Sequence, residues 1–351
     1  MYLPCGTYNV NYGQDLAFVR TRFHWGISIA ALVLIFIMPL FVPIDFITLT
    51  NFIGITIVVA HGLNILTGYA GQMSLGQSAF MMVGAYTSAI LTRHLGCPFL
   101  LALLLSGLTA GVVGFIFGIP SLRVKGFYLA MATLAAQFII PWLVVNVRPD
   151  ITAGAQSFRV PAITVGNMTF NTQTEMFYII IPIAGLMTLF AKNLSRSKLG
   201  RAFVAIRDND LAAEVQGIDI FRYKLIAFFI CSFYAGVGGS LWAHWVRAVN
   251  SDQFTLMHSI WFLGIIIVGG MGSISGIVMG SVFIRLLDYL AALITPLIAK
   301  SMPAISSQIE ASLTPIIFGF LVLLFVILEP RGLYHRWEIL KAKYRMWPYS
   351  Y

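Results

Sequence analysis

Charged residues are scarce in this sequence. Only 10% of its 351 residues are charged, whereas 59% are hydrophobic and the mean hydropathy is +0.86. Ordinary soluble domains carry about 25% charged residues, so this composition excludes that class and places most of the chain in lipid. The net charge of +9 does not indicate a nucleic-acid partner, because the basic residues cluster in a few short segments between apolar runs.

Cysteine is also rare. Cys5, Cys97 and Cys231 are scattered and form no Cys-x-x-Cys pair, so neither a disulfide framework nor a metal site is predicted. The apolar run from Gly26 to Phe41 is followed by no small-residue cleavage site. We therefore expect a retained first helix and no cleaved signal peptide.

The sequence lacks the motifs of enzymes that use ATP or cleave peptides in membranes. No Gly-Lys pair occurs, which excludes a Walker A loop and places the energy source on another chain. The patterns His-Glu-x-x-His, Gly-x-Gly-Asp and Gly-x-Ser-Gly are absent as well. We predict a protein that catalyses no covalent reaction and binds no cofactor itself.

Few titratable residues lie inside the apolar runs, and this bears on ion coupling. The candidates are His61, His244, Arg285 and Asp288. Arg285 and Asp288 are three residues apart on one predicted helix, so we expect them to neutralise each other. No obvious ion-coupling acid is left, although an ion-coupled secondary transporter stays the alternative function and the role of His61 stays open.

Long apolar runs are what the sequence has in abundance. A membrane-spanning helix needs about 20 apolar residues at about 1.5 Å each. Two shorter runs, 51–66 and 79–92, flank a glycine-rich stretch and are interpreted as helices that meet at a break. The sequence thus predicts an all-α integral membrane protein with about ten transmembrane segments and glycine-broken helices. The eight longer runs lie near 26–43, 99–118, 126–146, 175–191, 223–246, 259–270, 276–294 and 313–328.

The basic residues predict an orientation. If both termini are cytoplasmic, the inner segments hold sixteen Lys and Arg residues and the outer segments hold five. This asymmetry agrees with the positive-inside rule. It divides the chain into a cytoplasmic segment 1–25, a membrane domain 26–328 and a cytoplasmic tail 329–351. Within the domain we expect a periplasmic loop at 147–174 and a cytoplasmic loop at 193–222.

The stretch from Gly68 to Gln77 places glycines, glutamines and a serine at membrane depth. Such backbone is tolerated in lipid only where it is buried in protein or lines a water-filled cavity. Close helix packing is the alternative for the glycines, whereas the glutamines favour a substrate path. The residues predicted to line this path are Asn64, Gly68, Gly71, Gln72, Ser74 and Gln77.

The run from His61 to Phe80 resembles the first motif of the branched-chain amino acid permeases, the LivM-type subunits of ABC importers. Glycine-rich stretches at 235–241 and 268–280 also resemble that family, so the resemblance covers about residues 50–290.

The segment 122–135 is similar to the same family and adds Tyr128 and Thr133 as candidate path residues. Arg123 and Lys125 in this segment are interpreted as interfacial anchors.

The polar segment 193–222 predicts one amphipathic helix over 201–218. Val204, Leu211, Val215 and Ile218 recur at helical spacing and give it an apolar stripe. A membrane-surface helix is the alternative, but such a helix is expected to have a basic polar face. The face here mixes acidic and basic residues, which favours a protein groove.

The resemblance implies that this helix is the cytoplasmic coupling helix of ABC importers. Ala212, Ala213, Gly217 and Ile226 fit the spacing of that motif, and Leu211 stands where a glutamate is usual. The residues predicted to contact the ATPase are Arg201, Val204, Arg207, Asp208, Leu211, Ala212, Ala213 and Gly217.

The resemblance further implies a multi-pass permease subunit of the bacterial inner membrane that moves branched-chain amino acids by alternating access. Its implied partners are a second related permease, two cytoplasmic ATPases that hold ATP and Mg²⁺, and a periplasmic binding protein. The stretch 152–158 departs from the Thr-Gly-Gly pattern of the family. Urea, short amides and aromatic acids therefore stay open as substrates.

Overall fold

The computed structural model describes residues 22–122, 127–154, 156–165, 168–301 and 306–346. Most of the predicted N-terminal segment 1–25, and Arg123 and Lys125, lie outside these residues. The chain forms two units, residues 1–47 and 48–351. In the first unit, α2 (Arg22–Ile37) is followed by the short helix η1 (Met38–Leu40), whose first turn contains a proline.

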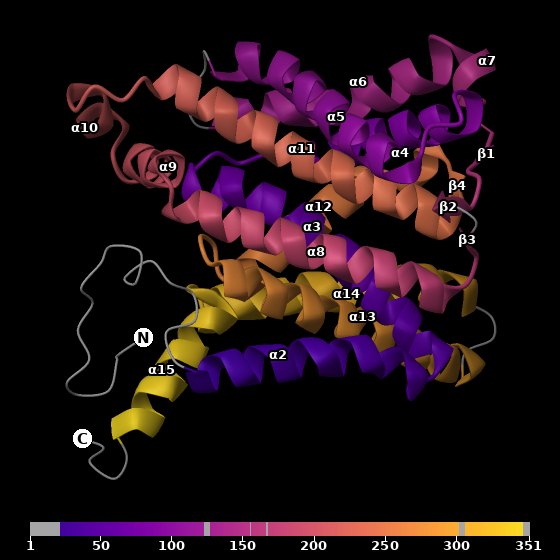
Figure 1. The fold of residues 1–351 in the computed structure, drawn as a ribbon. Helices are drawn as coiled ribbons and strands as arrows, with labels where there is room; N and C mark the ends of the chain where they lie inside the picture. Colours follow the sequence, from indigo (N-terminus) through magenta and orange to yellow (C-terminus); the bar gives the residue numbers. More distant parts are fainter. Residues whose placement is uncertain (1–21, 123–126, 155, 166–167, 302–305, 347–351) are drawn as a thin grey trace. The chain divides into compact units, whose positions relative to one another are not determined.

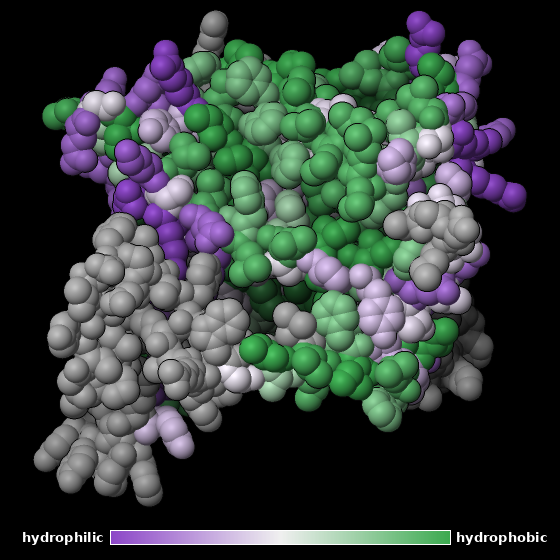
Figure 2. All heavy atoms as spheres, viewed as in Figure 1, coloured by the Kyte–Doolittle hydropathy of each residue, from purple (hydrophilic) through white to green (hydrophobic). Residues whose placement is uncertain are grey.

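The second unit is built from long apolar helices (Figure 1). α3 begins at Ile44, in the first unit, and a π-helical turn, η2, prolongs it. Figure 2 shows hydrophobic side chains across the middle of the face that contains α5 and α11, with hydrophilic side chains gathered at the two ends of these helices. This distribution suits a domain that crosses a bilayer. The long helices are α3 (Ile44–Asn64), α4 (Gln77–His94), α5 (Phe99–Leu122), α6 (Phe127–Asn146), α8 (Gln173–Arg196), α11 (Ile220–Val246), α12 (Leu256–Gly269), α13 (Ile274–Ser301), α14 (Ser306–Leu328) and α15 (Gly332–Met346).

The described helices confirm a multi-pass, all-helical membrane domain but not the predicted count of about ten spans. Seven are long and apolar enough to cross a membrane, and the bent pair α14–α15 brings the number to eight. α2 and α4 account for the difference. The described part of α2 has 16 residues, or about 24 Å, which is short of the hydrocarbon thickness. α4 has 18 residues but carries several polar side chains, and most of it is buried in the domain.

The core of the second unit lies where α4, α5 and α11 pack against one another. Small residues let these backbones approach closely, because a Cβ added at Gly84 or Gly239 would overlap backbone atoms of the facing helix. Large side chains fill the space beside these contacts, and the rings of Phe80 and Phe228 meet edge to face at 6.0 Å. The centre of the domain is therefore closely packed protein.

The segment after α8 contains two helices where one was predicted. α9 (Lys198–Asp208) ends at Asn209, which has φ −157° and ψ 108°, and α10 (Asp210–Val215) begins a new axis. The Asn209 side chain accepts a hydrogen bond from the amide of Ala212 at 3.1 Å and caps α10. The prediction of a continuous helix over 201–218 is therefore wrong, because an N-capping asparagine interrupts it.

The opposite end of the domain carries short strands that the sequence did not predict. β1 (Phe158–Arg159) pairs antiparallel with β4 (Ala248–Val249), and β2 (Ile163–Val165) pairs with β3 (Met168–Phe170). The small helices α7 (Pro149–Thr152) and η3 (Ser251–Gln253) lie in the same connections. Since α8 and α11 each run from one end to the other, this end lies opposite α9 and α10 (Figure 1).

Candidate functional site

The predicted break between α3 and α4 is present. α3 passes into η2 (Ile65–Tyr69), and the chain then leaves helical geometry until Gln77 begins α4. Gly71 has φ +69°, a conformation that favours glycine. The amide of Gln72 donates to the carbonyl of Leu66 at 3.0 Å, so part of the break is closed by its own backbone.

Side chains from two other helices accept hydrogen bonds from backbone amides at the start of α4. On α6, Thr133 accepts from the amide of Leu75 at 2.9 Å and Gln137 accepts from the amide of Ala79 at 3.0 Å. On α12, Ser259 accepts from the amide of Ser78 at 2.9 Å. A helix beginning at membrane depth leaves amides without intrahelical partners, and these three side chains supply acceptors.

The polar residues predicted for the substrate path are buried in this state. The Gln77 side chain donates to the carbonyl of Val59 at 3.1 Å and accepts from the Cys231 thiol at 3.1 Å. Tyr128 lies in the first turn of α6, and its side chain is outside the described part of the structure. The structure thus shows close packing at the break, and a role in a path stays a prediction. The buried members of the predicted set are Asn64, Gln72, Ser74, Gln77 and Thr133.

A second break, between α12 and α13, lies directly against the first. Gly270 and Gly272 have φ +110° and +78°, and the chain turns through them into Ile274. The amide of Gly272 donates to Oδ1 of Asn64 at 2.9 Å, and a Cβ at Gly68 would overlap the backbone of Gly272. Asn64 and Gly272 are 208 residues apart, so this hydrogen bond joins two segments that are distant in the sequence.

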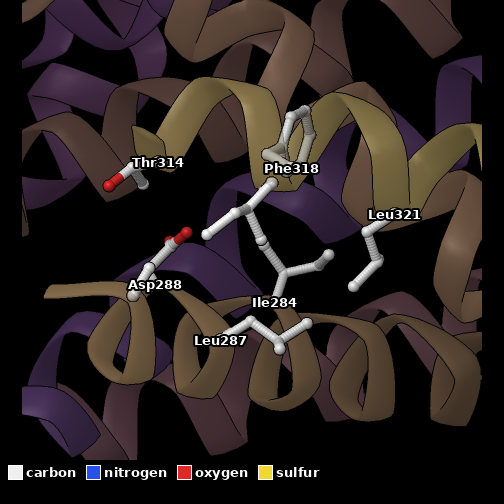
Figure 3. Close-up of a pocket in the computed structure, with 8 residues that line it drawn as sticks. Ile284, Leu287, Asp288, Thr314, Phe318 and Leu321 are labelled. Carbon is white, nitrogen blue, oxygen red and sulfur yellow. The ribbon is translucent and has the colours of Figure 1, made fainter. Parts of the chain in front are cut away.

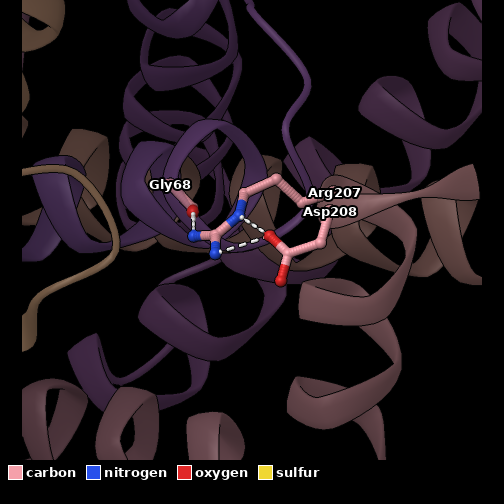
Figure 4. Close-up of polar contacts among 3 residues, drawn as sticks. All are labelled: Gly68, Arg207 and Asp208. Atoms are coloured by element: carbon pink, nitrogen blue, oxygen red, sulfur yellow. Dashed lines mark hydrogen bonds and ion pairs between the residues drawn. The ribbon is translucent and has the colours of Figure 1, made fainter.

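Arg207 of α9 connects the polar segment to this meeting point (Figure 4). Its Nη1 donates to the carbonyl of Gly68 at 2.8 Å. Its Nε and Nη2 donate to Oδ1 of Asp208 at 3.0 and 2.9 Å, which holds the guanidinium in place. Gly71 packs on the same side chain, since its added Cβ would lie 2.8 Å from Cγ of Arg207. We call residues 64–72, 207 and 270–273 the junction.

A polar recess of about 340 Å³ opens beside the junction. It is lined by residues 70–72 from the break, residues 206–210 from α9 and the start of α10, and Lys224 from α11. The sequence assigned Arg207 and Asp208 to the ATPase contact, which stays a prediction, and it did not indicate that Arg207 bonds to Gly68 of the break while Asp208 bonds to Arg207. Nothing in the local spacing indicated this, because Arg207 and Gly68 are 139 residues apart.

The other residues predicted for the ATPase contact differ in exposure. Leu211 and Val215 on α10 are 64% and 88% exposed, and Arg201, Ala212 and Gly217 are exposed as well. Val204 is half-buried, and Ala213 is only 2% exposed. Gly217 follows the C-cap of α10 and has φ +83°, a conformation that favours glycine. A glycine at this position therefore helps to end the helix. Leu211 and Val215 therefore form an exposed apolar surface on α10, which we call the apolar tip.

The titratable residues inside the described spans include an ion pair between Arg285 and Asp288. Among the described residues, no group of His, Cys, Asp and Glu could hold a metal ion. Arg285, 3% exposed, donates to Asp288 at 3.0 Å, and its guanidinium carbon lies 3.7 Å from the ring centroid of Phe52. Asp288 faces Thr314 of α14 across a cavity of about 10 Å³ (Figure 3). The expected mutual neutralisation of Arg285 and Asp288 is confirmed.

His61 is buried in α3 close to the break. Neither ring nitrogen has a hydrogen-bond partner among the residues that the structure describes.

These features define a multi-pass membrane protein with broken helices and, at one end, a polar segment whose helix α10 exposes apolar side chains. The family described as branched-chain amino acid transport system / permease component matches residues 46–327, and the chain belongs to this family.

Three relatives carry the same kind of name. The chain is 32% identical to the high-affinity branched-chain amino acid transport system permease protein LivM of Salmonella typhimurium, over 69% of this chain and 61% of that protein. It is 32% identical to LivM of Escherichia coli, over 73% of this chain and 66% of that protein. A probable LivM of Methanocaldococcus jannaschii is 24% identical over 80% of this chain and 90% of that protein.

The chain thus spans less than two thirds of the length of the first two relatives. No solved structure matches it.

Proposed function

We propose that this chain is a permease subunit of an ATP-driven importer for branched-chain amino acids. Its family and the names of its relatives support the substrate class. In this proposal the chain catalyses no covalent step. ATP and Mg²⁺ bind to two separate ATPase subunits, a second related permease completes the path, and a periplasmic protein delivers the substrate.

One observation carries the proposal most directly. The apolar tip of α10 is exposed and lies on the same short segment as Arg207, which contacts the break in α3. Leaving Leu211 and Val215 in water forgoes on the order of 1 to 2 kcal/mol each relative to burial, so a covering partner is favoured. A partner docked on this tip is joined to the membrane helices through α9. Closure of two ATPases is transmitted along this route.

The orientation in the membrane is part of the same proposal. The polar segment with α9 and α10 faces the cytoplasm, both termini are cytoplasmic, and the strand-bearing end faces the periplasm across a bacterial inner membrane. The sixteen-to-five distribution of Lys and Arg supports this arrangement. Alternating access then consists of rearrangements at the junction that open one end of the domain while the other is closed.

The test is removal of the apolar tip without disturbing the fold. Leu211→Glu combined with Val215→Glu places charges on two exposed positions. We expect the purified permease to keep its helicity and thermal unfolding temperature but to lose co-purifying ATPase subunits and amino-acid uptake. Retention of both the ATPases and normal uptake would contradict the proposal.

The choice of variants matters for this test. Glu214→Gln and Gln216→Glu change neighbouring exposed positions and serve as controls that should keep the ATPases. Substitutions at Gly217 or Ala213 are less informative. Gly217 has a positive φ, and Ala213 is buried, so bulky residues there would distort α10 itself.

A further inference from the structure

A second cavity lies at the end of the domain opposite α9 and α10. It has a volume of about 400 Å³ and is bounded by α6 and by the segment 251–256 that leads into α12. Along α6 it extends from Asn146 to Gln137, which is about 13 Å of helix. The space is open to the outside, since Phe138 and Trp142 are 61% and 62% exposed, and its volume lies within the range of about 300 to 1,000 Å³ typical of ligand pockets. We call this space the Asp252 cavity.

The lining of the Asp252 cavity combines one charge with apolar surface. Asp252 supplies a carboxylate, and none of the described residues that line the space is Lys or Arg. Asn146, Ser251 and Thr255 add an amide and two hydroxyls, while Phe138, Trp142 and Phe254 supply aromatic surface. A carboxylate on a membrane-spanning domain indicates water rather than lipid beside it. This lining fits a ligand with a cationic group, a hydrogen-bonding group and an apolar body.

The inner wall of the cavity is connected to the start of α4. Phe254 is 2% exposed, and its carbonyl accepts from the Gln137 side chain at 2.8 Å. The same side chain accepts from the amide of Ala79 at 3.0 Å and from the hydroxyl of Ser259 at 3.1 Å. The Gln137 side chain therefore links Ala79 of α4 to the backbone of Phe254, so a shift of α4 relative to α6 moves Phe254 as well.

Phe254 also lines a smaller cavity of about 20 Å³. It is lined by Arg285, Trp242 and Ser78, and the hydroxyl of Ser78 has no hydrogen-bond partner within the described part of the chain. This volume holds about one water molecule, so it admits no amino acid in the present state. Phe254 thus lines both a ligand-sized space and a buried one that contains a guanidinium and an unpaired hydroxyl.

We propose that the Asp252 cavity binds a free aliphatic amino acid, with its ammonium group at Asp252 and its side chain against Phe138, Trp142 and Phe254. Phe254 is the closed inner wall of this site. The inference takes its ligand class from the proposed function. It adds where that ligand binds and that Asp252 recognises its ammonium group. The requirement for an ammonium group excludes urea and simple carboxylic acids as occupants.

The experiment measures protection of a cysteine placed in the cavity. The full chain, expressed with its transport partners, carries Ser251→Cys after its own cysteines are replaced, and labelling by a maleimide is timed in membranes. Leucine and isoamylamine, which has no carboxylate, should slow labelling roughly tenfold at about ten times their Kd. Isocaproate, which has no ammonium group, should not. Ser157→Cys, exposed in the same loop region but outside the cavity, should be unprotected.

Variants of Asp252 decide the role of the carboxylate. Asp252→Asn should abolish protection by leucine, and Asp252→Glu should keep it. Absence of protection by leucine, or equal protection in Asp252→Asn, would overturn the inference. Leucine uptake measured in the same membranes separates the two proposals: uptake without protection leaves the proposed function standing, whereas protection without uptake leaves the site and removes the transport role.

Discussion

The two breaks in the membrane helices differ in the contacts that the helix following each break makes with its neighbours. At the first, the amides that begin α4 are bonded by side chains of Thr133, Gln137 and Ser259. Beside the second, whose Gly272 amide also bonds to the Asn64 side chain, α13 packs on α12 with backbone against backbone: a Cβ added at Gly280 would be 2.6 Å from the carbonyl oxygen of Ile265 and 2.8 Å from Cα of Gly269. Side-chain acceptors can change rotamer and partner, whereas a glycine contact has no such freedom. We therefore call the first break adjustable, because its side-chain contacts can rearrange. We call the second the fixed point, because the backbone contacts beside it cannot.

The largest effect on stability is expected at the fixed point. Gly280→Ala adds one methyl group where the facing atoms are backbone, so we expect a loss of about 1 to 3 kcal/mol in stability. The matched control is Gly319→Ala in α14, where no atom lies within 4 Å of the added methyl. Thermal unfolding of the two purified variants in detergent measures the difference. Equal unfolding temperatures would show that the second break is not rigid.

A smaller effect is expected at the adjustable break. Gln137→Leu keeps the approximate size of the side chain but removes bonds to Ala79, Ser259 and Phe254. Buried groups left without partners cost about 1 to 3 kcal/mol, and a shift of the freed groups toward other partners reduces the loss to the lower end of this range. Thr188→Val is the control, because the Thr188 hydroxyl bonds to Ala184 within its own helix. A loss as large as that of Gly280→Ala would remove the distinction between the breaks.

The smallest effect on stability, with the clearest effect on transport, is expected at Arg207. Arg207→Ala removes the bond to Gly68 from a half-exposed side chain, so stability should fall by about 1 kcal/mol or less. Uptake per ATP hydrolysed should fall because α9 no longer holds the break. Arg222→Ala is the control, since Arg222 is an exposed residue that pairs with the neighbouring Asp219 and belongs to neither the junction nor the predicted ATPase contact. Unchanged coupling in Arg207→Ala would show that the Gly68 contact is incidental.

The sequence predicted the features that depend on local spacing. Glycines and glutamines at membrane depth indicated the break from Gly68 to Gln77, and the spacing of Arg285 and Asp288 indicated their ion pair. The apolar spacing of Val204, Leu211 and Val215 is compatible with a single helix, and it therefore led to the wrong prediction of one continuous helix. Asn209 followed by Asp210 is a capping signal that could have indicated the interruption.

Long-range contacts could not be predicted in the same way. No pattern within a segment shows that Arg207 reaches Gly68 or that Gly272 reaches Asn64. A lone glutamine in the apolar helix α6 was a signal that Gln137 needs polar partners, but not which partners. The strands β1–β4 have two or three residues each, too few for an alternating pattern to appear.

The acceptors at the start of α4 have a consequence for the order in which the chain is assembled. Thr133 and Gln137 follow their donors Leu75 and Ala79 by 58 residues, but Ser259 follows Ser78 by 181. A chain that enters the membrane from its N-terminus presents these amides long before the last acceptor has been synthesised. A backbone amide without a hydrogen bond in hydrocarbon costs several kcal/mol. The partly synthesised chain must therefore keep α4 near water or at the insertion machinery until α12 has been synthesised and inserted.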